Sequence, residues 1–217
     1  MTEPIRVLLV DDQSLIRIGF RMMLEAEGDI EVVGEAGDGA VAVRQAAALS
    51  PDVVLMDVRM PGMDGIAATE TIVREHPGIR VLVLTTFDLD EYAFGAIRAG
   101  ASGFLLKDAQ RAELVAAVRA VHRGDAVLAP RATRAFLDQL SAQPAPASSG
   151  PDPTTALTER EREVFLAIAQ GLTNAEIADQ LFLSESTVKT HVGRVLAKLD
   201  ARDRIEAVII AHRCGLV

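Results

Sequence analysis

Short apolar runs alternate with amphipathic segments along the first part of the chain. Five runs are rich in Val, Leu and Ile and have the length of buried β-strands. They cover residues 5–10, 30–36, 53–56, 80–85 and 103–106. The segments between them have apolar residues at helical spacing. The first predicted helix begins at Ser14, and the others cover 39–49, 65–75, 90–99 and 111–123. This alternation predicts an α/β fold in which helices cover both faces of a five-stranded parallel sheet, a doubly wound arrangement.

The last third of the chain has apolar positions at helical spacing only, and polar residues mark the starts of its helices. Two starts have the form of a capping box, in which a threonine and a later glutamate satisfy free backbone amides reciprocally. They are Thr158-x-x-Glu161 and Thr173-x-x-Glu176. Ser184 and Asp203 are placed to cap two more helices. The pattern predicts a second domain of four short helices.

Proline and serine dominate residues 141–153, a composition typical of a linker. We therefore expect a first domain at 1–125 and a second at 154–217. The linker between them covers 126–153 and includes a short helix at 131–140.

The composition, 49% hydrophobic and 24% charged, is that of a folded protein. No apolar run approaches the roughly 18 residues of a membrane-spanning helix, and no basic stretch precedes an apolar segment at the N-terminus. The single cysteine, Cys214, has no partner for an intramolecular disulfide, and no Cys/His cluster has zinc spacing. These features favour a soluble, cytoplasmic protein with no membrane partner.

The net charge of −9 is unevenly distributed. Residues 1–125 include 12 basic and 20 acidic side chains, whereas residues 126–217 include 10 and 11. The segment 186–199 has several basic residues, namely Lys189, His191, Arg194 and Lys198, and no acidic one. Because local charge governs docking to a polyanion, nucleic acid stays a candidate partner of the second domain.

Charged and polar residues stand where the predicted strands end. Asp11 and Asp12 follow the first strand, and Asp57 follows the third. The carboxyl ends of parallel strands share one edge of a sheet, so we expect these carboxylates to lie together. They repel one another and require a cation, and hard oxygen ligands suit Mg²⁺. Thr85 and Lys107 end the fourth and fifth strands and supply the donors that a transferred phosphoryl group requires.

Asp57 taken by itself is compatible with a structural role or with two enzyme classes. An aspartate before a turn such as that at Pro61-Gly62 is usually structural. Phosphatases of the haloacid-dehalogenase type also place an aspartate after a parallel strand, but they need a second one two residues later, where this chain has Arg59. The P-loop pattern of many kinases is absent. Neither enzyme class is supported.

The motifs at the strand ends form an ordered set. It consists of Asp11-Asp12, Asp57 followed by Met60-Pro61-Gly62-Met63-Asp64-Gly65, Thr85, and Gly103-Phe104-Leu105-Leu106-Lys107. With this set, residues 5–123 resemble the receiver domain of two-component response regulators. The resemblance implies a flavodoxin-like sheet and makes Asp57 the phosphoacceptor. It also implies that Asp12, Asp57 and the backbone carbonyl of Arg59 bind Mg²⁺ directly and that Asp11 binds it through water.

The same resemblance implies a switch. Thr85 is drawn toward the phosphoryl group, Phe104 is the switch aromatic that turns inward, and Lys107 pairs with the phosphoryl oxygens. Asp108 departs from the pattern, because many receivers have proline there, and a cis bond before a non-proline residue is costly. Phe87 flanks the path of attacking water, and we predict that its bulk slows phosphoryl loss. Such a protein takes part in its own phosphotransfer and dephosphorylation and is not otherwise an enzyme.

Residues 157–212 resemble a LuxR-type helix-turn-helix. The motifs are Leu157-Thr158-Glu159-Arg160-Glu161, Gly171-Leu172-Thr173-Asn174-Ala175-Glu176-Ile177-Ala178 and Leu183-Ser184-Glu185-Ser186-Thr187-Val188-Lys189-Thr190-His191. Within 185–199, apolar residues form one helical stripe that is expected to face the core. The stripe consists of Val188, Val192, Val195 and Leu199. The opposite face is narrow and basic, which suits the major groove of DNA.

The predicted DNA contacts divide into two classes. Lys189 and Thr190 are candidates for base contacts. The candidates for phosphate contacts are Thr187, Arg194 and Lys198. His191 faces either the edge of the groove or the preceding helix. Gly193 stands where some relatives have a basic residue, so one base contact is missing.

A single helical domain with three or four phosphate contacts binds DNA only modestly. We therefore expect a homodimer on activation, with Ile205, Val208 and Ile209 as a candidate interface, although packing inside the domain explains part of that stripe equally well. The sequence predicts a response regulator of the NarL/FixJ class that controls transcription. Its expected partners are a cognate sensor histidine kinase and promoter DNA, with RNA polymerase as a further candidate. The alternative is a DNA-binding regulator that works without phosphorylation and whose receiver is only an interaction module.

Overall fold

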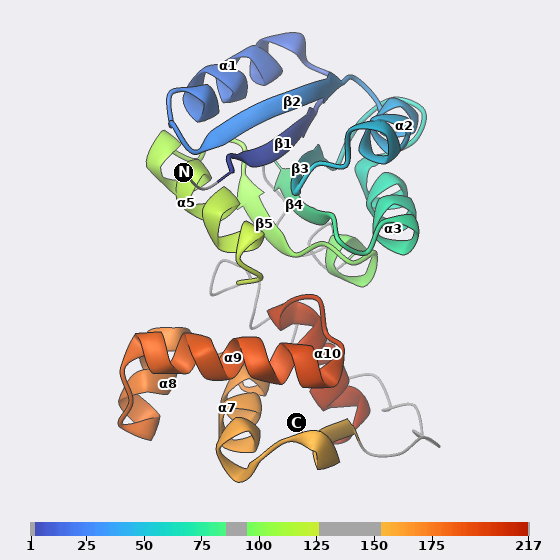
Figure 1. Ribbon diagram of the computed structural model, residues 1–217. Helices are drawn as coiled ribbons and strands as arrows, with labels where there is room; N and C mark the ends of the chain where they lie inside the picture. The colour runs from blue at the N-terminus through green and yellow to red at the C-terminus, as the bar shows by residue number, and fades with distance from the viewer. Residues whose placement is uncertain (1–2, 86–94, 126–152, 217) are drawn as a thin grey trace. The chain divides into compact units, whose positions relative to one another are not determined.

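A computed structural model describes residues 3–85, 95–125 and 153–216 of the chain (Figure 1). The chain divides into two compact units, residues 1–132 and 133–217. Three expectations fall wholly or largely outside the described residues. These are the linker at 126–153 with its helix at 131–140, the role of Phe87, and the helix at 90–99, of which residues 95–99 are described and 95–98 are helical. Within the described ranges, no helix combines the length and apolar character needed to cross a membrane.

The first unit is built on the predicted five-stranded sheet. Its strands are β1 (Ile5–Val10), β2 (Ile30–Ala36), β3 (Val53–Asp57), β4 (Arg80–Thr85) and β5 (Gly103–Leu106). They lie in the order β2-β1-β3-β4-β5, and every neighbouring pair is parallel. The chain leaves β1 toward β2 and then returns to the other side of β1 with β3. The strand order therefore reverses between β1 and β3, the point at which open α/β sheets bind ligands.

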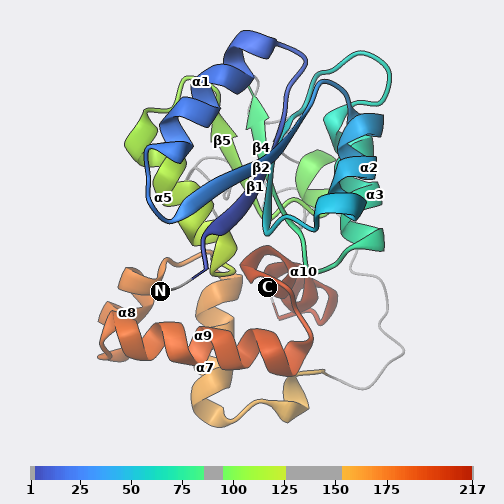
Figure 2. The same ribbon diagram turned by 45° about the horizontal axis from the view of Figure 1, so that its top comes forward.

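Helices cover both faces of this sheet, as the alternating pattern predicted. The helices are α1 (Ser14–Glu25), α2 (Gly39–Leu49), α3 (Gly65–Glu75) and α5 (Arg111–His122). Helices α1 and α5 lie on one face, and α2 and α3 lie on the other (Figures 1 and 2). The fold class expected from the sequence is confirmed.

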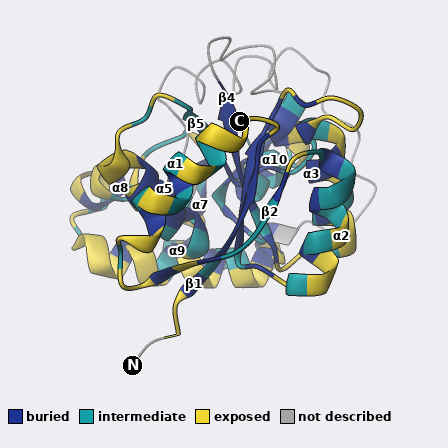
Figure 3. Ribbon diagram, turned by 90° about the horizontal axis from the view of Figure 1, so that it is seen from above, coloured by how far each residue is buried: buried dark blue, intermediate teal, exposed yellow. Residues whose placement is uncertain are grey.

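The core of this unit consists of two apolar layers separated by the sheet. One layer joins Leu8 and Met56 to α2 and α3 through Ala46 and Ile72, and also contains Phe104. The other layer packs alternate strand residues against α1 and α5. Figure 3 shows the sheet coloured mostly as buried, with the exposed positions on the outer sides of the helices. Strand β3 is buried at every residue, because both of its faces are covered. This explains why its sequence is continuously apolar up to its terminal aspartate.

Local signals set the start of α3 next to β3. The side chain of Asp64 accepts a hydrogen bond from the Ala67 amide and caps the helix. Gly65 begins the helix against the end of β3, where its amide donates to the carbonyl of Val58 at 2.9 Å. A β-carbon added at Gly65 would lie 1.9 Å from the carbonyl oxygen of Asp57. Glycine is therefore required here by close approach of two backbone segments.

In the second unit, the described residues 153–216 form the four predicted helices and one short 3₁₀ turn that was not predicted. The elements are η1 (Pro153–Ala156), α7 (Glu159–Ala169), α8 (Asn174–Leu181), α9 (Glu185–Leu199) and α10 (Arg204–Arg213). The four helices have the predicted capping residues, Thr158, Thr173, Ser184 and Asp203. Both capping boxes are complete. The local polar pattern was therefore sufficient to locate every helix start.

The turn between α8 and α9 has an unusual residue. Phe182 has φ of 54° and ψ of 47°, in the left-handed region, and its exposed fraction is 95%. A bulky side chain at positive φ is uncommon, because its β-carbon approaches a backbone oxygen. The helix-turn-helix therefore contains an exposed aromatic residue in an unfavourable backbone conformation.

Candidate functional site

The strand ends bring the predicted polar residues to one edge of the sheet. Asp11 directly follows β1, Asp57 ends the adjacent β3, and Thr85 ends β4. Lys107 directly follows the edge strand β5, and its amide donates to the carbonyl of Thr85 at 2.8 Å. The carboxylates of Asp11 and Asp57 are almost wholly buried, whereas Asp12 is exposed.

Lys107 binds both buried carboxylates. Its Nζ lies 2.6 Å from Oδ2 of Asp11 and 2.8 Å from Oδ2 of Asp57. The remaining oxygens meet backbone amides. Oδ1 of Asp11 accepts from Gln13 at 2.9 Å, and Oδ1 of Asp57 accepts from Arg59 at 3.3 Å. The ammonium group of Lys107 thus lies between the carboxylates of Asp11 and Asp57, which come from the ends of two different strands.

These contacts shift the protonation equilibria of the site. Burial raises the pKa of Asp57, and the attraction of Lys107 opposes this rise without cancelling it. Burial also opposes the charge on Lys107, but its contacts to Asp11 and Asp57 raise the pKa of the ammonium group overall. Lys107 therefore stays protonated at neutral pH.

The acidic residues fit a divalent cation. Ligand oxygens of Asp11, Asp12 and Asp57 all lie within 4.8 Å of one another. Carboxylate oxygens are the ligands that Mg²⁺ prefers, and Mg²⁺ usually takes one or two of them together with waters. Asp12 has its side chain exposed to solvent, so the cluster is open on one side. A role for the carbonyl of Arg59 stays a prediction.

The two residues of the predicted switch are both buried. Thr85 is 5% exposed and Phe104 is 2% exposed. Phe104 lies within the apolar layer on the side of α2 and α3, and it pairs in register with Val83 of β4. The described conformation thus has the aromatic ring inside, and its movement on activation stays a prediction.

In the second unit, α9 has the predicted two faces. Its apolar stripe is buried, as expected, and comprises Val188, Val192, Val195 and Leu199. The candidate DNA contacts are all exposed, namely Thr187, Lys189, Thr190, Arg194 and Lys198. His191 is half-buried, with its Nδ1 buried and without a hydrogen-bond partner. In α10, Ile205 and Val208 of the candidate interface stripe are buried, and Ile209 is half-buried.

Some hydroxyl and ammonium groups on α9 already have partners within the unit. The hydroxyl of Thr187 lies 2.8 Å from that of Ser184, and the hydroxyl of Thr190 donates to the carbonyl of Ser186. Nζ of Lys198 lies 2.6 Å from Oε2 of Glu161 on α7. The sequence did not suggest this ion pair, and the role of Lys198 as a phosphate contact stays a prediction.

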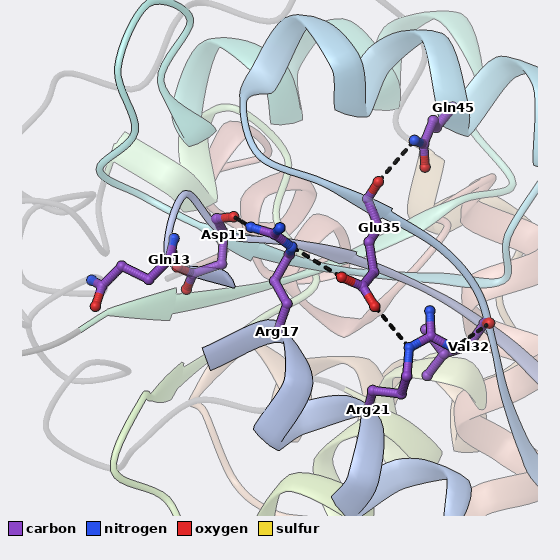
Figure 4. A network of polar contacts seen from close by, with 7 residues as sticks. All are labelled: Asp11, Gln13, Arg17, Arg21, Val32, Glu35 and Gln45. Atoms are coloured by element: carbon purple, nitrogen blue, oxygen red, sulfur yellow. Dashed lines mark hydrogen bonds and ion pairs between the residues drawn. The ribbon is translucent and has the colours of Figure 1, made fainter. Parts of the chain in front are cut away.

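A second polar network, next to the acidic cluster, was also missed from the sequence (Figure 4). Arg17 and Arg21 of α1 both donate to the carboxylate of Glu35 on β2, at 3.1 and 2.7 Å. Arg17 also donates to the backbone carbonyl of Asp11 at 2.6 Å. The sequence marks these residues only as charged positions on a helix and a strand.

Comparisons with known proteins agree with both units. Residues 7–119 match the response regulator receiver domain family, and residues 155–211 match the LuxR family of bacterial regulatory proteins. The chain belongs to the two-component response regulators that join a receiver to a LuxR-type DNA-binding domain and regulate transcription. This is a family of regulators and not generally of enzymes.

Individual relatives match over almost the whole chain. The transcriptional regulatory protein LiaR of Bacillus subtilis is 46% identical over 98% of this chain and 99% of its own. The response regulator VraR of Staphylococcus aureus is 39% identical over 98% of this chain and 99% of its own. Among solved structures, the response regulator ChrA of a heme-sensing two-component system is 38% identical, covers both chains fully and has a TM-score of 0.53.

Proposed function

We propose that a sensor histidine kinase transfers a phosphoryl group to Asp57 and that this modification controls DNA binding by the second unit. The observation that supports this most strongly is the position of Asp57. It lies at the end of a buried central strand, within 4.8 Å of two other acidic side chains and 2.8 Å from a lysine ammonium. The combination of a carboxylate nucleophile, a hard-cation site and a fixed cationic donor suits phosphoryl transfer.

The transfer exchanges one bond to phosphorus for another. The phosphorus–nitrogen bond of a phosphohistidine on the kinase breaks as a carboxylate oxygen of Asp57 bonds to phosphorus, and the imidazole leaves with the electron pair. Lys107 already lies beside the Asp57 carboxylate, so its charge stabilises the incoming phosphoryl oxygens without further movement. Asp11, Asp12 and Asp57 would hold Mg²⁺, which neutralises charge on those oxygens.

Incubation with acetyl phosphate and Mg²⁺ tests this proposal. The intact chain should gain the mass of one phosphoryl group, and the Asp57→Asn variant should not. Asp64→Asn is a matched control, because Asp64 is a nearby exposed carboxylate that caps α3. No mass gain in the wild-type chain, or equal labelling of Asp57→Asn, would contradict the assignment.

The output is proposed to be binding of a homodimer to promoter DNA. Analytical ultracentrifugation and DNA binding before and after phosphorylation measure both steps. Labelling at Asp57 without a change in oligomeric state or DNA affinity would favour the alternative, in which the receiver serves only as an interaction module.

Base and phosphate contacts on α9 are distinguished by two variants. Lys189→Ala should weaken binding to the specific site by about 1–3 kcal/mol and weaken non-specific binding less. Arg194→Ala should weaken both similarly and reduce the salt dependence of binding by about one counterion. Equal losses for specific and non-specific DNA in Lys189→Ala would make that residue a phosphate contact.

A further inference from the structure

Arg17 is the residue of α1 that reaches the loop carrying the acidic pair. It lies on the first turn of the helix, and its side chain is 18% exposed. Nη1 donates to the backbone carbonyl of Asp11 at 2.6 Å, while Nε donates to Glu35 at 3.1 Å (Figure 4). The guanidinium group therefore spans from β2 to the segment that follows β1.

The carbonyl that Arg17 binds belongs to the peptide group between Asp11 and Asp12. The hydrogen bond from Arg17 restrains ψ of Asp11 and φ of Asp12, the two dihedrals beside this planar group that set the direction in which the chain continues from Asp11 to Asp12. The amide of Asp11 is also fixed, since it donates to the carbonyl of Ala36 at 3.1 Å. Without Arg17, the backbone carbonyl of Asp11 would lose the hydrogen-bond donor that holds it. The Asp11 carboxylate is also held by Lys107 and by the amide of Gln13, so Arg17 contributes the restraint on the backbone that carries the chain on to Asp12.

Glu35 in turn holds Arg17 in place. Its carboxylate lies between Arg17 and Arg21, and its backbone carbonyl accepts a hydrogen bond from Gln45 of α2 at 2.8 Å. Arg21 and Arg17 lower the pKa of Glu35, so it stays ionised at neutral pH. The planar guanidinium group of Arg17 donates to Glu35 and to the Asp11 carbonyl at the same time. A lysine ammonium group does not hold its donors in such a fixed planar arrangement.

Arg21 provides a natural comparison within the same network. It binds the same carboxylate and also contacts Glu25 and the carbonyl of Val32. These contacts tie α1 to β2 and to its own next turn, and none of them involves Asp11. Arg21 and Arg17 therefore share a role in joining α1 to β2, but of the two it is Arg17 that donates to the acidic loop.

We propose that Arg17 is a positioning residue for the divalent cation, because it fixes the Asp11–Asp12 peptide group in the orientation that brings these side chains to Asp57. The inference rests on the proposed function, in which the acidic cluster holds Mg²⁺. Partners that orient metal ligands without touching the metal typically change metal affinity by about 10- to 100-fold when they are removed.

The test measures the dissociation constant of the unphosphorylated full-length chain for Mg²⁺ by isothermal titration calorimetry. Arg17→Met should raise it by about tenfold or more, whereas the matched control Arg21→Met should leave it much closer to the wild-type value, because the hydrogen bonds of Arg21 go to Glu35, Glu25 and Val32 and not to the Asp11 carbonyl. Both variants lose an ion pair with Glu35 and Arg21→Met also loses the pair with Glu25, so the thermal unfolding midpoint should fall at least as far in the control as in Arg17→Met. Arg17→Lys keeps the charge and should recover only part of the affinity.

The outcomes separate this inference from the proposal on which it rests. No Mg²⁺ binding by the wild-type chain would contradict the metal site itself. Binding by the wild type with the same affinity in Arg17→Met, or an equal loss in Arg21→Met, would overturn the role of Arg17 alone. If Arg17→Met does not fold, as judged by circular dichroism, Arg17→Lys against Arg21→Lys decides the question by the same comparison.

Discussion

Asp57 has two opposing requirements. It is only 4% exposed, yet the proposed attack on phosphorus requires it to be ionised. Because burial raises its pKa above the ordinary 3.8, the folded state binds the proton more tightly than the unfolded state does. The free energy of unfolding contributed by this group therefore falls as the pH rises from the ordinary carboxyl range through the raised pKa.

The variant Asp57→Asn should not lose stability in this way as the pH rises, since an amide does not ionise. We expect it to be more stable than the wild type at neutral pH in the absence of divalent cations. The difference should shrink under acidic conditions that protonate the wild-type carboxyl. Urea unfolding of both proteins across this pH range measures the difference, and an advantage that does not depend on pH would contradict this account of the carboxyl group.

The backbone conformation of Phe182 leads to a second prediction about a single residue. The left-handed conformation costs a non-glycine residue about 1–2 kcal/mol, and the 95% exposed ring has little packing to lose. Phe182→Gly should therefore stabilise the second unit, by about 1 kcal/mol after the entropy of glycine in the unfolded chain is counted. Thermal unfolding checks this, and a lower midpoint for the variant would show that the ring has contacts of its own.

At the scale of elements, glycines in two helices differ in what surrounds them. A β-carbon at Gly65 of α3 would collide with the carbonyl of Asp57, whereas no described atom lies within 4 Å of the β-carbon position of Gly193 in α9. Gly65→Ala should destabilise the receiver by more than about 2 kcal/mol, because backbone must move to admit the methyl group. Gly193→Ala should stabilise its helix by about 0.5–1 kcal/mol. Chemical denaturation of the two variants tests both signs.

The ion pair between α7 and α9 predicts a pH dependence for the second unit. Lys198 lowers the pKa of Glu161 to about 2, with help from the amide of Thr158 in the capping box. The stabilisation is therefore present above the ordinary pKa of 4.5 and is lost as the pH falls toward about 2.

Replacing the partner should reduce this acid sensitivity. Lys198→Met should lower the unfolding midpoint of the second unit at neutral pH and should lose less stability than the wild type on acidification. Thermal unfolding followed by circular dichroism at several pH values measures the effect. Parallel pH profiles for the two proteins would mean that the ion pair contributes nothing measurable.

The helices and strands could be predicted from the sequence because their causes are local. Strand β3 is apolar on both faces up to Asp57, since helices cover the sheet on each side, and α7 and α8 start with capping side chains that reach the residue three positions on. The short turn η1 was missed, because one turn of 3₁₀ helix leaves no periodic pattern.

At the scale of the whole molecule, the site was predictable for a topological reason. A parallel sheet places the carboxyl ends of all its strands at one edge, so Asp11, Asp57 and Lys107 meet whatever their separation in sequence. The contacts Arg17–Glu35 and Lys198–Glu161 could not be predicted in this way. They depend on which faces of two packed elements meet, and no sequence spacing specifies that.

The position of Lys107 after an edge strand also affects how the receiver becomes competent during folding. The acidic residues lie at the ends of the inner strands β1 and β3. Strand β5 pairs with β4 alone and is the last of the five strands in the sequence. A chain whose sheet lacks β5 would have the carboxylates in place without the ammonium group that neutralises them. Contacts between residues far apart in sequence cost the entropy of closing the intervening loop before they contribute to stability. In the proposed function, a receiver in which β5 is not yet paired would therefore lack the ammonium group that meets the phosphoryl oxygens.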